Sequence, residues 1–94
     1  MEITELRIRK VNAEGKLKAY VTITFDDCFV VHNVKIIESD TGLFIAMPSR
    51  KTAEGKYKDI AHPISMEFRA VLQDRILADY NAGKYEESAS ADDL

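Results

Sequence analysis

LKAYVTITF, residues Leu17 to Phe25, is the stretch of sequence that decides the fold. Apolar and polar side chains alternate along it, and the apolar positions are Leu17, Ala19, Val21, Ile23 and Phe25. Successive side chains of a strand point to opposite faces, and β-branched residues are common in strands. The segment is therefore predicted to be a β-strand with one buried face. The other face carries Lys18, Tyr20, Thr22 and Thr24.

The preceding segment, Met1 to Val11, has the same period of two, because Leu6 and Ile8 alternate with charged residues. Residues 12–16 read NAEGK and supply turn chemistry, since Gly15 can adopt a positive φ without a steric cost. We therefore expect these two segments to pair as an antiparallel hairpin.

The segment that follows the hairpin has no clear period. Asp26 and Asp27 interrupt the alternation, and residues 28–37 read CFVVHNVKII. This pattern fits one long buried strand, and it also fits a helical turn, capped by Asp27, that leads into a strand. We favour a strand from about Val34 to Glu38 and leave residues 28–33 open.

A second tight turn precedes Leu43 to Met47, which is apolar on both sides. That composition indicates either a strand in a central position of the sheet or a strand on a face of the sheet that other elements cover. Pro48 cannot donate to a strand ladder, so regular pairing should weaken there. Residues 49–56 are predicted to form a loop, and Tyr57 to Ala61 a short return strand.

The residues after Pro63 have the pattern of a helix that ends before Gly83. Ser65 is the expected N-cap, and Glu67 is favourable in the first turn. The apolar positions at helical spacing are Phe68, Val71, Leu72, Ile76 and Tyr80. The positions expected to face solvent are Glu67, Arg69, Gln73, Asp74 and Asp79.

Together these elements predict the α+β class, with an antiparallel β-sheet of about five strands and a C-terminal α-helix. Residues 1–85 form one domain, and residues 86–94 are expected to be an acidic disordered tail. A chain of 94 residues buries only about 60–65% of its unfolded surface, so dimerisation would add stability. There is no apolar run of the ~18 residues that span a membrane and no signal-peptide pattern, and the single Cys28 fits a reducing cytoplasm.

The charge distribution singles out one segment. The net charge is −3 at pH 7, but residues 86–94 contribute −4, which leaves +1 on the body. Residues 47–58 hold one acid, Glu54, and the cations Arg50, Lys51, Lys56 and Lys58. Such a segment on a nearly neutral body can contact phosphates: Arg50 could bind a phosphate or a guanine through two hydrogen bonds, and Lys51 would act as a point charge. The alternative is a solvated hairpin tip.

No other residues make a convincing site. A metal needs three or four ligands, and Cys28 and His32 have only the distant His62 beside them. On a strand, Cys28 and His32 would lie roughly 13 Å apart, too far for proton transfer. We interpret them as a buried thiol and a structural or surface imidazole, and Asp26 and Asp27 as turn acids. We therefore predict no catalytic residue, metal, cofactor, enzymatic activity or small-molecule substrate.

The order of several motifs resembles one protein family. LFIAMPSRK at residues 43–51, followed by a glycine turn and DIAHPI at residues 59–64, closely resembles the SpoVG family of septation regulators. Three further runs are similar to that family: ITELRIRKV, AYVTITFDD and FVVHNVKIIES. The resemblance covers about residues 2–80.

The resemblance implies a small bacterial cytoplasmic homodimer, with an antiparallel sheet and a C-terminal helix, that takes part in the control of septation and, in spore formers, sporulation. It also implies a regulator that binds nucleic acid (DNA, with RNA as the alternative) with the basic pair that follows Pro-Ser, here Arg50 and Lys51. We add Lys56 and Lys58 as weaker contributors. From charge alone, the acidic tail is expected to compete with nucleic acid for the basic loop. The alternative is a protein-interaction module of the septation pathway without direct nucleic-acid binding.

Overall fold

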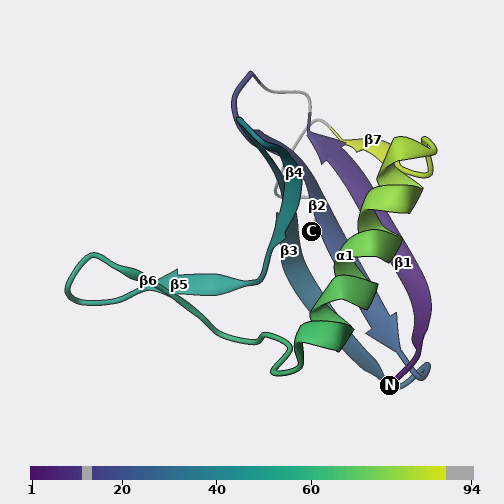
Figure 1. Ribbon diagram of the computed structural model, residues 1–94, viewed down its shortest axis with the longest axis horizontal. Coiled ribbons are helices and arrows are strands. Elements are labelled where there is room, and N and C mark those ends of the chain that lie inside the picture. The colour runs from purple at the N-terminus through teal and green to yellow at the C-terminus, as the bar shows by residue number, and fades with distance from the viewer. Residues whose placement is uncertain (12–13, 89–94) are drawn as a thin grey trace.

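The computed structural model describes residues 1–11 and 14–88. The elements along the chain are β1 (Ile3–Val11), β2 (Leu17–Phe25), β3 (Phe29–Ser39), β4 (Gly42–Ala46), β5 (Ser49–Lys51), β6 (Tyr57–Asp59), α1 (Met66–Asn81) and β7 (Glu86–Ser88). One layer is a sheet, and α1 lies across one of its faces, while β5 and β6 project away from both (Figure 1).

The main sheet has the strand order β4-β3-β2-β1-β7. Its first four strands are antiparallel to their neighbours, and β7 adds to β1 in parallel. The predicted hairpin is confirmed, with Ile8 opposite Val21. The α+β class with an antiparallel sheet and a C-terminal helix is confirmed as well.

The segment left open by the sequence pattern is a strand from Phe29 onward and not only from about Val34, while Cys28 belongs to the preceding turn. Val31 pairs with Ile23 and Val34 with Val21, so three steps along β3 match two steps along β2. The extra residue makes a bulge in which Asn33 has a φ of 65°. A bulge shifts the phase of the alternation, which is why a period of two could not be followed across residues 28–37.

The turn between β2 and β3 explains the adjacent acids. Asp26 and Asp27 both have positive φ, and the Cys28 N–H donates to the Phe25 carbonyl at 3.0 Å. The Asp26 carboxylate accepts a hydrogen bond from the Glu2 N–H at 2.9 Å. The interpretation of the two acids as turn residues is confirmed. The thiol of Cys28 is exposed, so the expectation that it is buried is wrong.

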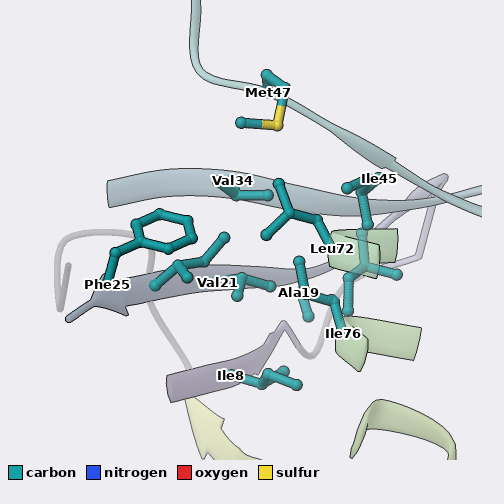
Figure 2. Close-up of a cluster of buried hydrophobic side chains, with 11 residues drawn as sticks. Ile8, Ala19, Val21, Phe25, Val34, Ile45, Met47, Leu72 and Ile76 are labelled. Atoms are coloured by element: carbon teal, nitrogen blue, oxygen red, sulfur yellow. The ribbon is translucent and has the colours of Figure 1, made fainter. Parts of the chain in front are cut away.

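The hydrophobic core lies between the sheet and α1 (Figure 2). Its buried residues are Ile8, Ala19, Val21, Ile23, Phe25, Val34, Ile36, Ile45, Met47, Leu72 and Ile76. Strand β4 supplies Ile45 to this core but lies at the edge of the sheet. Of the two explanations for its apolar sequence, the covered face is therefore right and the central position is wrong.

Helix α1 starts as predicted: the Phe68 N–H donates to the Ser65 Oγ at 3.1 Å. Gly83, with a φ of 79°, follows its last turn. Leu72 and Ile76 are buried, but Val71 is 54% exposed and does not belong to the buried stripe. Each helical residue is rotated by about 100° from the previous one, so Val71 points away when Leu72 faces the sheet. No helix within residues 1–11 and 14–88 is long and apolar enough to cross a membrane.

The start of the predicted disordered tail is structured. Residues Glu86–Ser88 form β7, which satisfies backbone groups at the edge of β1. Just before it, the ring of Tyr85 packs against Tyr80 at a centroid distance of 5.4 Å, and the Lys10 Nζ lies 5.2 Å from the Tyr85 ring centroid. The rest of the tail, residues 89–94, lies outside the described residues.

Candidate nucleic-acid interface

The four predicted binding cations lie on a two-stranded antiparallel ribbon, β5–β6, which leaves the body at the β4 edge (Figure 1). Arg50 and Lys51 belong to β5 and not to a loop, which corrects the expectation for residues 49–56. Pairing in the main sheet ends at Ala46, two residues before Pro48, and the chain then resumes a strand that pairs with β6 instead. The predicted return strand is shorter than expected, at Tyr57–Asp59.

Hydrogen bonds hold the ribbon at both ends. At its base, the Ile60 N–H donates to the Pro48 carbonyl at 2.7 Å. At its tip, the Thr52 N–H donates to the Lys56 carbonyl at 2.7 Å, and the Gly55 N–H donates to the Thr52 carbonyl at 3.0 Å. Gly55 has a φ of 83°, which glycine adopts without strain. These bonds fix the register in which the cations face one another.

The register divides the cations between two faces. Arg50 pairs with Lys58, and Lys51 pairs with Tyr57. Since neighbouring strand residues point to opposite faces, the sequence pair Arg50–Lys51 is split. One face presents two cations directly opposite each other, and the other presents a cation beside an aromatic ring. Lys56 lies outside this pairing, at the tip of the ribbon.

The Arg50–Lys58 pair is electrostatically unfavourable in the free protein, because like charges directly opposite one another destabilise a strand pair. All four cations are exposed. Among the described residues, none of the ion pairs involves any of these four side chains. A bound anion such as phosphate would relieve the repulsion between Arg50 and Lys58.

Tyr57 is a candidate site residue that the charge count did not identify. It is 74% exposed and lies across from Lys51. An exposed aromatic ring beside a cation can stack on an unpaired base while the cation contacts phosphate. The available signal was the alternation of Lys56, Tyr57 and Lys58 in the sequence.

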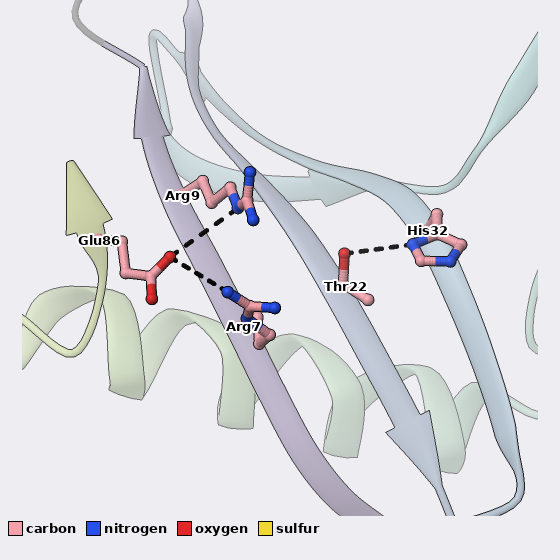
Figure 3. Close-up of polar contacts among 5 residues, drawn as sticks. All are labelled: Arg7, Arg9, Thr22, His32 and Glu86. Atoms are coloured by element: carbon pink, nitrogen blue, oxygen red, sulfur yellow. Dashed lines mark hydrogen bonds and ion pairs between the residues drawn. The ribbon is translucent and has the colours of Figure 1, made fainter. Parts of the chain in front are cut away.

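Each of the two histidines has a polar contact with a residue outside the β5–β6 ribbon. The Nδ1 of His32 lies 3.5 Å from the Thr22 Oγ1 (Figure 3), and the Nδ1 of His62 lies 3.1 Å from the Pro63 carbonyl oxygen. In the part of the chain that the structure describes, no group of three or more His, Cys, Asp or Glu side chains could hold a metal.

An apolar hollow lies where the β2–β3 turn approaches the start of α1, with a volume of about 370 Å³. Its lining includes Phe29, Met47, Ile64 and Phe68. Ile64 is 96% exposed, and neighbouring Met66 is also exposed. No local sequence pattern predicts this surface, because its residues come from separate elements that the fold brings together.

Comparison with known proteins identifies the family of this chain. A family model described as SpoVG matches residues 1–82, which include the ribbon and α1. A protein of Thermoanaerobacter sp. (strain X514), called "Putative septation protein SpoVG", is 60% identical over 89 residues, covering 95% of this chain and 97% of its own. Proteins of the same name from Caldicellulosiruptor saccharolyticus and Clostridium acetobutylicum are 58% identical over 82 residues and 55% identical over 92 residues. These two alignments cover 87% and 98% of this chain, and 93% and 97% of the relatives. This chain belongs to the SpoVG family.

Proposed function

We propose that this protein is a cytoplasmic, homodimeric regulator of cell-division septation, and of sporulation in spore formers, that acts by binding nucleic acid. The names of its relatives support the septation role. The observation that carries the binding role is the pair Arg50 and Lys58, opposite each other on a projecting ribbon and without an acidic partner among the described residues. The proposed action is binding, with no chemical step.

The shape of the ribbon favours a particular kind of target. A two-stranded β-ribbon can enter the major groove of B-form DNA, whereas the deep, narrow major groove of an RNA duplex excludes it. Arg50 would bind a phosphate or the O6/N7 edge of guanine, and Lys58 an adjacent phosphate. RNA would be bound through single-stranded segments, with an unpaired base on Tyr57 and phosphate on Lys51.

The apolar hollow is the proposed contact between two copies of the chain. Ile64 and Met66 are too exposed to contribute to the core of one copy, and burying them against a second copy would stabilise both. A two-fold dimer presents two ribbons, and two ribbons match two half-sites of a pseudo-symmetric target.

The same hollow also favours the second candidate, a protein-interaction module of the septation pathway, because exposed apolar surfaces commonly bind other proteins. The two functions predict opposite effects of nuclease treatment on the binding of a septation partner. A septation partner that remains bound after nuclease treatment, together with no binding of labelled DNA or RNA at moderate salt, would select the interaction module.

The test is a salt-titrated binding assay with labelled duplex DNA and single-stranded RNA. We expect the double variant Arg50→Ala, Lys51→Ala to bind more weakly and with a shallower salt dependence, since each lost phosphate contact reduces the slope by about 0.9 on duplex DNA. The matched control is Arg69→Ala, Arg75→Ala, which removes the same charge from α1, where both residues are exposed. Equal binding by wild type and the ribbon variant would exclude the ribbon as the site.

A further inference from the structure

The face of the sheet opposite α1 carries a second group of cations. Arg9, Tyr20 and Lys35 are in register with one another across β1, β2 and β3. Arg7 is paired with Thr22 in the next row, where the Thr22 Oγ1 lies 3.5 Å from the Nδ1 of His32. Figure 3 shows Arg7, Arg9, Thr22 and His32 in front of the strands, with α1 behind them.

The C-terminal segment places one carboxylate at this face. An oxygen of Glu86, Oε2, lies 3.4 Å from the Arg7 Nη2 and 3.9 Å from the Arg9 Nε. Within the described residues, strand β7, which carries Glu86, is attached to β1 through three register pairs. The side chains of Glu86 and Arg7 are 65% and 50% exposed, so water screens this contact and a stronger anion can replace it.

Among the described residues, the other charged side chains on this face are mostly cationic. Lys18 already has a partner, since its Nζ lies 3.6 Å from a Glu38 carboxylate oxygen. Lys35 takes part in none of the ion pairs found within the described residues. In the part of the chain that the structure describes, the one other acid in register on this face is Glu5, opposite Thr24 at the far end from Arg9.

We propose that this face, built on Arg7, Arg9, Tyr20 and Lys35, is a second nucleic-acid site that binds a single strand, and that Glu86 occupies it in the free protein. A sheet face with cations on both sides of a half-buried tyrosine suits a single strand, because the cations follow the phosphates while a base stacks on the ring. The inference rests on the proposed nucleic-acid function and extends it. In this proposal the acidic C-terminal segment competes with nucleic acid for the face of the sheet, and not for the ribbon.

The test uses the full chain and a fluorescein-labelled 20-nucleotide poly(dT) strand at low salt. Glu86→Gln keeps the shape of the side chain and removes its charge, and it should tighten binding by about two- to five-fold, the range typical of an exposed ion pair. The gain should persist in the Arg50→Ala, Lys51→Ala background and disappear in the Arg7→Ala, Arg9→Ala background. Asp74→Asn, at an exposed position of α1 outside both proposed sites, is the matched control for loss of one negative charge.

The experimental outcomes that overturn the sheet site differ from the outcome that overturns both nucleic-acid proposals. No binding of any nucleic acid by wild type would overturn both proposals, whereas ribbon-dependent binding that Glu86→Gln does not change would overturn the sheet site alone. An equal gain in both double-variant backgrounds would reduce the effect to net charge and overturn the sheet site. An equal gain for a poly-glutamate peptide would make the face an acidic-peptide site and would also overturn it. If Arg7→Ala, Arg9→Ala fails to fold in thermal melts, Arg7→Gln, Arg9→Gln, which keeps the aliphatic stems, takes its place.

Discussion

Arg50 and Lys58 lie directly opposite each other in the β5–β6 ribbon, although each belongs to a chain segment with an acid close by in sequence. The register places Asp59 across from Ser49 and leaves Glu54 in the tip turn, so neither is the cross-strand partner of these cations. The repulsion between Arg50 and Lys58 therefore remains in the free protein, and a bound phosphate would relieve it.

A charge reversal tests this relationship. Lys58→Glu places a carboxylate opposite Arg50, so the ribbon should become more ordered while nucleic-acid affinity falls by more than about ten-fold, because a phosphate contact is replaced by a repulsion. Fluorescence anisotropy at several salt concentrations measures the loss. Arg69→Glu on α1 is the control for the same change of net charge. A similar loss with the control would assign the effect to the overall field of the protein.

The tip of the ribbon offers a variant that changes conformation without changing charge. Gly55 has a φ of 83° and open space where a Cβ would lie, so Gly55→Ala introduces backbone strain of about 1 kcal/mol and no clash. We expect weaker DNA binding with an almost unchanged melting temperature, since the ribbon lies outside the core. A melting temperature that falls by many degrees would show that the ribbon contributes to global stability.

The core should respond to truncation at the centre of the sheet. Ile36 is fully buried between the sheet and α1, so Ile36→Ala should reduce the free energy of unfolding by about 2–5 kcal/mol, as measured by urea denaturation. Val30→Ala on the same strand is the control, because Val30 is 47% exposed. A loss below about 1 kcal/mol at Ile36 would mean that the space is refilled by neighbouring side chains.

The proposed dimer contact predicts a change of mass. Ile64→Glu places a charge in the apolar hollow, so the protein should elute as a monomer in size-exclusion chromatography with light scattering, while its circular dichroism stays the same. Phe44→Glu, at an exposed position on the edge strand β4, should remain dimeric. Dissociation by Phe44→Glu alone would move the interface from the hollow to the strand edge.

Local sequence patterns predicted an element correctly where its residues follow a single local rule, such as alternation in a strand or capping of a helix. The alternation in Leu17–Phe25 predicted β2 to the residue, and Ser65 predicted the start of α1, because each reflects neighbouring side chains in a regular element. Prediction failed where the structure depends on how two segments of the chain pair with each other. The bulge at Asn33 broke the period of β3, and the edge position of β4 depended on which strand paired beside it.

By itself, the sequence determined the class of the fold, the hairpin, the helix and its cap, and the concentration of cations in residues 47–58. Only the tertiary structure decided which of these cations share a face, since the β5–β6 register splits Arg50 from Lys51 and sets Arg50 against Lys58. It also brought Glu86 to Arg7 and Arg9, residues nearly the whole chain apart, and gathered the apolar hollow around Ile64. The physical reason is that alternation and capping are short-range, whereas register and strand order are set by long-range pairing and burial that no single segment encodes.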